Sequence, residues 1–282
     1  MNTRQDGKVW LITGSSTGFG RILAETVLKK GDRVIATARK PEQLADLITQ
    51  YPETAFAVSL DVTNKAEIQT AIEQAIAKFG RIDVLVNNAG YGLIGALEEV
   101  SDTQIQRNFN TNLFGAINVM RAVLPIMRSQ QSGHIINMSA IAGFSNELGF
   151  SIYGGAKFAL EGVSEALQGE VAPLGIKVTI VEPGPFRTDF IGRSLDRASE
   201  QMDAYQDSVG KFLNFLNNIE GKQPGDPQKA AEAIIKVVNS ENPPLRLVLG
   251  KYAYSKFRKK LESLTAELDA WEEIAANTDF EN

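Results

Sequence analysis

The sequence predicts an α/β protein, a doubly wound parallel sheet of about seven strands with helices on both faces. Three observations lead to this prediction. Short apolar runs rich in β-branched residues alternate with longer amphipathic segments along most of the 282 residues. The runs are apolar throughout, which is typical of parallel strands buried on both faces. A glycine-rich turn follows the first run directly, and the amphipathic segments are long enough to cross one face of a sheet.

The alternation places the individual elements. The expected strands are residues 8–13, 33–38, 55–60, 82–87, 134–139, 177–182 and 245–250. The expected crossover helices are residues 20–30, 41–50, 64–79, 102–128, 154–173 and 227–239. No low-complexity linker interrupts the alternation, which continues to about residue 250. We therefore interpret residues 1–282 as a single domain.

Two segments stand outside the alternation. Residues 188–224 form an insertion after the carboxyl end of a strand, with apolar residues at helical spacing between Met202 and Leu216. The insertion could form a wall or lid of the substrate site, or it could be a helix that covers the core, and both interpretations stay open. Residues 251–282 form a helical extension with a stripe of apolar side chains, which we expect to pack on the core. The stripe consists of Phe257, Leu261, Leu264, Leu268 and Trp271.

The composition argues against several classes of function. The net charge of −5 gives no electrostatic reason to expect nucleic acid or an anionic membrane as a partner. The chain has no cysteine and a single histidine, His134, so we expect no metal site and assign His134 a packing role at a strand end. The first residues contain no signal-peptide core, and no apolar stretch is long enough to span a bilayer. We expect a soluble cytoplasmic protein.

The glycine-rich turn indicates a nucleotide site. In "TGSSTGFG" at residues 13–20, Gly14, Gly18 and Gly20 permit a tight turn and let backbone N–H groups approach a pyrophosphate at a helix start. The spacing G-x-x-x-G-x-G differs from the general dinucleotide fingerprint, so the position after the first strand is the stronger signal.

The end of the second strand bears on which dinucleotide binds. NAD-binding sheets usually place an acidic residue there, whereas this chain has Ala38 followed by Arg39 and Lys40. Two cations beside a neutral residue suit a 2′-phosphate, which arginine can bind with two parallel hydrogen bonds. We therefore expect NADP(H) in preference to NAD. The alternative is that Arg39 and Lys40 are ordinary cations of a surface loop.

Tyr153 and Lys157 lie four positions apart in "SIYGGAKFAL", so in a helix they share one face. A Y-x-x-x-K match alone is common by chance. Further short motifs follow the strands, namely Asp61-Val62, "NNAG" (87–90), "NTNLFG" (110–115), "NMSAIAG" (137–143) and "VEPGPFRTD" (181–189). Taken in this order, the motifs over residues 8 to about 190 resemble the short-chain dehydrogenase/reductase family, in its one-domain, NADP-preferring branch.

The resemblance implies a Rossmann-type fold and a set of site residues. In the family's mechanism Tyr153 is the proton donor when a carbonyl is reduced, Lys157 holds the ribose hydroxyls and lowers the tyrosine pKa, and Asn112 helps to hold a water that relays protons. The implied contacts with the cofactor phosphates are Gly14, Ser16, Gly18, Phe19 and Gly20, with Arg39 on the 2′-phosphate. Asp61 and Val62 are implied beside the adenine, and the ribose contacts are Asn88, Ala89, Gly90, Tyr153 and Lys157. The implied contacts near the nicotinamide are Pro183, Gly184, Phe186 and Thr188.

Physical chemistry supports the pairing of a tyrosine with a lysine. A phenol titrates near pH 10, so lowering its pKa to about 7 needs roughly 4 kcal/mol of preferential stabilisation of the phenolate. The Lys157 ammonium and the positive ring of an oxidised nicotinamide both supply charge of the right sign.

One position departs from the family pattern. The family usually has a serine about thirteen residues before the tyrosine, which hydrogen-bonds the substrate oxygen. Here Ala140 occupies that position, and Ser139 lies one residue earlier. Either the following loop lets Ser139 take the role, or the site lacks this hydrogen bond and reduction is slowed, typically by ~10²–10³-fold for a missing donor of this kind.

We therefore expect an NADPH-dependent reductase of ketones or aldehydes, or in reverse a secondary alcohol dehydrogenase. The alternatives are an NADP-binding sensor or scaffold with weakened catalysis, and an isomerase or dehydratase on the same fold. Apolar side chains that could form a substrate wall favour a bulky apolar substrate. They are Tyr91, Phe144, Leu148, Phe150, Phe186, Phe190 and the stripe at residues 202–216. The resemblance also implies a homodimer or homotetramer that pairs through the helices at 102–128 and 154–173.

Overall fold

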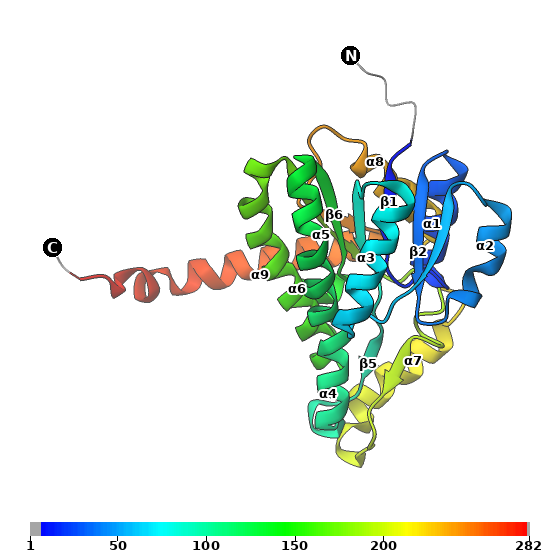
Figure 1. Cartoon of the computed structure of the whole chain (residues 1–282). Helices are drawn as coiled ribbons and strands as arrows, with labels where there is room; N and C mark the ends of the chain where they lie inside the picture. Colours follow the sequence, from blue (N-terminus) through cyan, green and yellow to red (C-terminus); the bar gives the residue numbers. More distant parts are fainter. Residues whose placement is uncertain (1–6, 281–282) are drawn as a thin grey trace.

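The structure, a computed structural model, describes residues 7–280 and centres on a sheet of seven parallel strands (Figure 1). The strands are β1 (Val9–Ile12), β2 (Arg33–Ala38), β3 (Ala55–Ser59), β4 (Val84–Asn87), β6 (Gly133–Met138), β7 (Ile176–Pro183) and β9 (Arg246–Leu249). Their order is β3-β2-β1-β4-β6-β7-β9. The chain leaves β1 toward one edge and returns to β4 on the other side, so the strand order reverses between β1 and β4. The predicted doubly wound sheet is confirmed.

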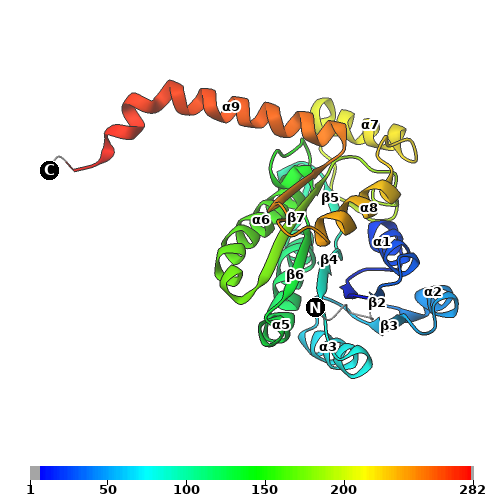
Figure 2. The same ribbon diagram turned by 90° about the horizontal axis from the view of Figure 1, so that it is seen from above.

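Helices cover both faces of the sheet (Figure 2). One core contains residues of α3 (Lys65–Phe79), α5 (Ala116–Gln130) and α6 (Ser151–Val171), and the other contains residues of α1 (Gly18–Lys29), α2 (Ala45–Gln50) and α8 (Pro227–Val238). Strand β1 shows how the sequence divides between the cores. Val9 and Leu11 face one, while Trp10 and Ile12 face the other, because successive strand residues point to opposite faces.

Side-chain caps fix where two of these helices begin. The Asn64 side chain accepts hydrogen bonds from the backbone N–H groups of the first turn of α3, and Asp226 does the same for α8. Pro227 then occupies the first turn of α8, where its missing N–H costs nothing.

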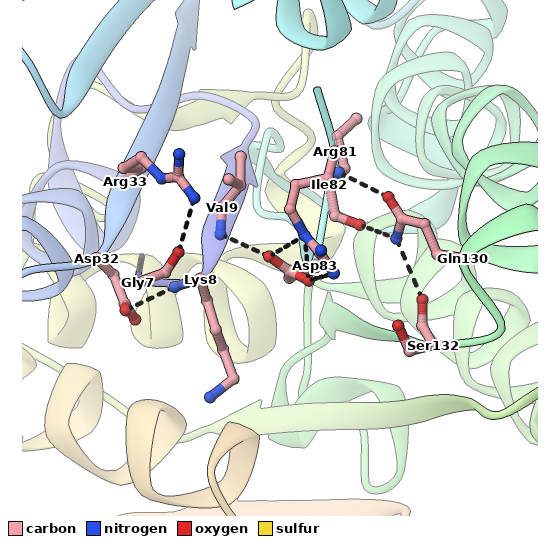
Figure 3. A network of polar contacts seen from close by, with 10 residues as sticks. All are labelled: Gly7, Lys8, Val9, Asp32, Arg33, Arg81, Ile82, Asp83, Gln130 and Ser132. Carbon is pink, nitrogen blue, oxygen red and sulfur yellow. Dashed lines mark hydrogen bonds and ion pairs between the residues drawn. The ribbon is translucent and has the colours of Figure 1, made fainter. Parts of the chain in front are cut away.

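A polar network joins the amino-terminal ends of the strands (Figure 3). It lies at the opposite end of the strands from the glycine-rich turn and the other short motifs. The buried carboxylate of Asp83 accepts a 2.9 Å hydrogen bond from the backbone N–H of Val9 and bonds from the Arg81 guanidinium. Gln130, at the end of α5, donates to the carbonyl of Ile82 at 2.8 Å and accepts from its N–H at 3.1 Å. These bonds fix β1, β4 and α5 relative to one another, and so they also fix where the carboxyl ends of the strands lie.

His134 has the packing role that the sequence predicts. It lies in β6 with its ring buried, and Nε2 is 3.0 Å from Thr179 Oγ1 on β7. Burial, together with the charges of Lys177 and Lys8, lowers its pKa to about 4. A histidine that is neutral at pH 7 is compatible with this buried position.

Two elements depart from the expected helices and strands. The helix expected over residues 102–128 is divided into α4 (Asp102–Phe109), a π-helical turn at Asn110–Gly115, and α5. A second, two-stranded parallel sheet joins β5 (Gly92–Ile94) to β8 (Leu195–Arg197). This pairing draws the insertion toward the carboxyl edge of the main sheet. Strands of three residues carry too little pattern for sequence to reveal them.

The expectation that the C-terminal stripe packs on the core is wrong for most of its length. Helix α9 (Lys251–Ala275) buries Ala253 and stacks Phe257 on Phe144, with ring centroids 3.9 Å apart. Beyond these residues it leaves the body, as both ribbon views show (Figures 1 and 2), and Leu268 and Trp271 are 72% and 63% exposed. The helix starts at the last strand of the sheet and is about 37 Å long at 1.5 Å per residue, so only its first turns lie against the body.

No helix among residues 7–280 has the length and apolar character that crossing a lipid bilayer requires.

Candidate functional site

The glycine-rich turn forms a cradle between β1 and α1. Gly14 and Gly18 have φ of +67° and +58°, a conformation that side-chain-bearing residues rarely adopt. A Cβ on Gly20 would collide with the carbonyl oxygen of Gly14 and the amide of Asn88. Thr17 precedes α1 and makes no side-chain cap, so the backbone N–H groups that open this helix are available to an anion. The cradle therefore fits the phosphates of a dinucleotide.

The end of β4 supports this turn from beneath. Asn88 Nδ2 donates to the carbonyls of Thr13 and Gly14 at 2.9 and 3.0 Å. In return, Thr13 Oγ1 accepts from the backbone N–H groups of Asn88 and Ala89, both at 2.9 Å. The Asn88 side chain thus fixes the shape of the phosphate cradle, a role that the sequence reading did not assign to it.

Asn112 and Lys157 converge on Gly90. A methyl group in place of the Gly90 hydrogen would lie 2.5 Å from Asn112 Oδ1 and 3.6 Å from Lys157 Nζ. Asn112 sits in the π-helical turn and donates through Nδ2 to the carbonyls of Tyr91 and Asn108, at 3.0 and 3.1 Å. Its buried Oδ1 has no hydrogen-bond partner among the described residues. This oxygen is an acceptor aimed at the space beside Gly90 and Lys157.

Tyr153 and Lys157 share one face of α6 at the carboxyl edge of the sheet. Both side chains are buried, and Lys157 Nζ lies 5.8 Å from the centre of the Tyr153 ring. Nζ also donates to the carbonyl of Met138 at 2.8 Å, which fixes the ammonium to the end of β6. The turn of helix that the sequence predicts between these two residues is present.

The pKa values differ from what the resemblance implies. Burial lowers the pKa of Lys157 to about 8, although the Glu161 carboxyl raises it in part. Burial also raises the pKa of the Tyr153 phenol above its usual range. The lowering of the tyrosine pKa by Lys157 stays a prediction. Desolvation of the phenolate is the cause of the raised Tyr153 pKa.

Ser139 and Ala140 point in different directions at the end of β6. Ser139 Oγ donates a 2.6 Å hydrogen bond to Glu161 Oε1, one turn beyond Lys157 on α6. Ala140 belongs instead to the apolar cluster that contains Tyr153. A hydroxyl has one proton, so Ser139 can donate to a substrate only after its bond to Glu161 breaks.

Behind Ser139 lies a group of buried charges that sequence reasoning missed. Arg246 Nε is 3.7 Å from Glu161 Oε2 and 3.5 Å from Glu182 Oε1, and its guanidinium also pairs with Glu165 at 2.7 Å. Glu182 is fully buried, and burial, together with the charge of Glu161, raises its pKa to about 8 despite Arg246. The signal that could have revealed this ion pair is a charged residue in each of two strand-like runs, Glu182 in "KVTIVE" and Arg246 in "LRLVLG".

Apolar side chains pack around the Tyr153 ring and form an apolar wall. The ring lies 5.6 Å from those of both Phe150 and Phe190, and Phe150 meets Phe212 edge-on at 5.9 Å. Leu216 of α7 (Lys211–Ile219) joins the same cluster. The insertion therefore contributes side chains next to Tyr153, which agrees with the substrate-wall interpretation of residues 188–224.

Three of the expected wall residues lie elsewhere. Phe144 stacks on Phe257 of α9, Phe186 packs against Phe19 with ring centroids 5.3 Å apart, and Leu148 is mostly exposed. The Tyr91 hydroxyl is buried with no hydrogen-bond partner among the described residues. The wall is thus built from α6, the loop before it and the insertion.

The remaining expected cofactor contacts line the carboxyl edge of the sheet. Arg39 and Lys40 are exposed after β2, and the Arg39 side chain forms no hydrogen bond or ion pair within the described residues. Asp61 caps its own turn by accepting from Thr63, and Val62 packs against Gly115. Ser16 is half-buried in the glycine turn, Pro183 ends β7, Gly184 bonds to the carbonyl of Leu249, and Thr188 approaches Gly18.

Comparison with known proteins agrees with this geometry. A family model described as short chain dehydrogenase matches residues 8–198. An oxidoreductase of Botryotinia fuckeliana, BOA17, is 42% identical over 269 residues, which cover 95% of this chain and 98% of that protein. A 3-ketodihydrosphingosine reductase of Bacteroides thetaiotaomicron is 40% identical over 255 residues, covering 89% and 91% of the two chains.

Solved structures match over nearly the whole length. A short-chain dehydrogenase from Streptomyces avermitilis has a TM-score of 0.91 and 44% identity, covering 97% of this chain and all of that one. ElxO, solved with NADP bound, has a TM-score of 0.73 and 30% identity, covering 88% of this chain and 99% of its own.

Proposed function

The chain belongs to the short-chain dehydrogenase family and is an oxidoreductase, and on this premise we propose that it reduces a ketone or aldehyde with NADPH. In reverse it would oxidise a secondary alcohol. The observation that most supports the proposal is the convergence of Asn112, Lys157 and Gly90 beside Tyr153, at the carboxyl edge of the sheet where such folds bind ligands. The phosphate cradle at Gly14 and Gly18 lies at the same edge.

The proposed roles follow from the position and protonation of each group. The nicotinamide, when bound, supplies hydride to the carbonyl carbon. Tyr153 gives its phenolic proton to the carbonyl oxygen, and its raised pKa keeps that proton in place at neutral pH. Lys157, with a pKa of about 8, is mostly an ammonium at pH 7 and can donate to ribose hydroxyls and stabilise the phenolate that forms. Asn112 Oδ1 can accept from a water that returns a proton to Tyr153.

The apolar wall favours a bulky apolar carbonyl substrate. Phe150 and Phe190 place their aromatic rings beside that of Tyr153, and Phe212 packs edge-on against Phe150. An apolar wall of this kind would contribute affinity through the apolar area that it covers, and the few polar groups would orient the reacting oxygen. The relative from Bacteroides thetaiotaomicron is named a 3-ketodihydrosphingosine reductase, which is in line with a ketone as substrate.

The hydrogen bond to the substrate oxygen comes mainly from Tyr153 in this proposal. Ala140 lies where the family's serine would stand and offers no donor. Ser139 is a second donor only if its hydroxyl turns from Glu161 to the substrate, which would leave a buried carboxyl oxygen without its partner. We therefore expect slow turnover with reactive ketones preferred.

We propose NADPH as the preferred cofactor, since the side chains of Arg39 and Lys40 are exposed after β2 and form no hydrogen bond or ion pair within residues 7–280. We also propose a homodimer or homotetramer through the faces of α5 and α6. Phe114, next to α5, and Phe158, on α6, are 50% and 45% exposed, which is apolar area that a second subunit would cover.

One observation favours a second candidate function. The lack of a donor at Ala140 fits an NADP-binding sensor with weakened catalysis. Retention of Tyr153, Lys157 and Asn112 together argues for the reductase, because a protein that only binds the dinucleotide has no need of a proton donor.

The test is a fluorescence titration of the pure protein with NADPH and NADH, followed by absorbance of the reduced nicotinamide as long-chain and aryl ketones are added. The reductase predicts tighter binding of NADPH and ketone-dependent oxidation that falls by about 10²–10⁴-fold in Tyr153→Phe. Binding of NADPH with no oxidation across the panel would favour the sensor instead. Tighter binding of NADH would overturn the cofactor assignment.

A further inference from the structure

The distal part of α9 is an apolar and charged surface that the proposed reaction does not use. From Tyr254 onward its apolar residues are spaced three and four apart, at Phe257, Leu261, Leu264, Leu268 and Trp271. This is the a/d spacing of a coiled coil, which needs a facing helix. Most of the stability of helices in proteins comes from packing of an apolar face, so an apolar stripe on α9 calls for a surface that covers it.

The root of the helix is already fixed to the body. Phe257 stacks on Phe144, Lys256 donates to the carbonyl of Asn146 at 3.0 Å, and both Tyr252 and Lys256 contact the carboxylate of Glu147. Beyond Phe257 the stripe has no such cover. Leu268, Trp271 and Ile274 are exposed, and the carboxyl end of the helix lies far from the other elements (Figures 1 and 2).

The charges of α9 are segregated along its length. Between Lys251 and Leu261 the charged residues are all basic, and from Glu262 to Ala275 they are all acidic. None of the charged side chains from Arg258 to Glu273 forms an ion pair within residues 7–280. A second copy of the helix in antiparallel orientation would place each basic half against an acidic half. A parallel copy would set like charges side by side.

We propose that α9 is an assembly arm that pairs with α9 of a second copy of this chain, antiparallel and through the stripe. Antiparallel pairing of a and d positions matches Leu261 with Leu264 of the second copy. It also places Leu268 of the second copy beside the exposed part of Phe257, which is half-buried and stacks its ring on Phe144. In that register Lys260 faces Glu267 of the second copy, and the two-fold axis repeats the contact. The occupant is a second copy rather than a membrane, because the acidic half would be repelled by anionic lipid.

The first experiment measures the self-association of the full-length protein by sedimentation velocity and light scattering. We expect the variant Leu268→Glu/Trp271→Glu to lower the assembly mass by half, or to raise the dissociation constant of the dimer at least tenfold. The matched control, Ala266→Glu/Ala270→Glu, adds the same charge to α9 outside the stripe and should assemble as the parent does. Helix content by circular dichroism and NADPH binding verify that both variants fold. Unchanged assembly of the stripe variant would overturn the proposal.

The second experiment tests orientation. Lys260→Glu should weaken association by about tenfold, because two glutamates would then face each other at both contacts, and adding Glu267→Lys should restore it. A parallel pair predicts instead that Lys260→Glu alone has little effect.

Disulfide cross-linking gives a second test of orientation. The chain has no native cysteine, so any disulfide must join the introduced cysteines. A mixture of the single variants Leu261→Cys and Leu264→Cys should cross-link to each other. Cross-linking of Leu268→Cys to itself would mean parallel helices and would overturn the proposal.

Discussion

The hydroxyl of Ser139 is bonded to Glu161 Oε1 at 2.6 Å, while the methyl group of its neighbour Ala140 lies in the apolar cluster around Tyr153. The two adjacent residues thus separate a buried polar network from the side where a substrate would bind. Sequence alone left open which of them serves the site. The geometry supports distinct roles, with Ser139 holding Glu161 and Ala140 lining the wall.

The first prediction concerns Ala140→Ser. The new hydroxyl would add a hydrogen bond to the substrate oxygen next to Tyr153, so we expect kcat for ketone reduction to rise by about tenfold or more. Steady-state kinetics with a single reactive ketone measure the change.

The matched control is Ser139→Ala, which removes the donor to Glu161. We expect it to lower the free energy of unfolding by about 1–3 kcal/mol, because a buried carboxyl oxygen loses its partner. We expect only a small change in kcat. If Ser139→Ala abolished turnover in a folded protein while Ala140→Ser changed nothing, Ser139 would be the substrate donor.

The second prediction tests Arg39. Removing its guanidinium should weaken NADPH binding by about tenfold or more and leave NADH binding unchanged, because charge-assisted hydrogen bonds to a phosphate contribute about 1.5–3 kcal/mol. Fluorescence titration of Arg39→Ala gives both dissociation constants. Lys40→Ala is the control and should have the smaller effect, since an ammonium does not form two parallel bonds. An equal loss for both cofactors would show that Arg39 does not recognise the 2′-phosphate.

The third prediction is the pH dependence of stability caused by Glu182. Its pKa rises from 4.5 to about 8 on folding, so between these values the folded state binds more protons than the unfolded state. The stabilisation is fully present below pH 4.5 and is lost as the pH rises through 8. We expect Glu182→Gln to remove this loss, on the order of a few kcal/mol, in urea unfolding measured from pH 5 to 8.

The control for Glu182 is Glu165→Gln, which also removes a carboxylate partner of Arg246 but at an exposed position. Its unfolding should keep the pH dependence of the parent, because exposed ion pairs contribute little. Parallel stability curves for the parent and Glu182→Gln would show that Glu182 is ionised in the folded protein at neutral pH.

The comparison of sequence with structure shows which signals are local. The buried strands and the Tyr153–Lys157 face were predictable, because continuous apolar runs and a four-residue spacing depend only on neighbours in the chain. The contacts of Glu161 and Glu182 with Arg246 were not, since they join helix α6 to strands β7 and β9. The α9 stripe illustrates a third case. Its periodicity is the same whether a core or a second subunit covers it, so sequence could not decide between them.

The last prediction concerns Gly90, where Asn112 and Lys157 converge. An alanine methyl there would lie 2.5 Å from Asn112 Oδ1, so the amide must shift. We expect Gly90→Ala to lower kcat/KM by about 10²-fold, because a displacement of about 1 Å at a reacting centre has an effect of that size, and to change the unfolding free energy less than a core substitution would. Initial rates with NADPH and a fixed ketone measure the loss.

Gly162→Ala, in α6, is the matched control for Gly90→Ala. A Cβ at Gly162 meets no atom within 4 Å, so this variant should keep full activity and gain about 0.5–1 kcal/mol of stability from its higher helix propensity. Full activity of Gly90→Ala would mean that the space beside Gly90 is not the reacting centre, and the assignment of Asn112 as the holder of a proton-relaying water would fail with it. A similar loss of activity in both variants would point to a general effect of added methyl groups and not to this site.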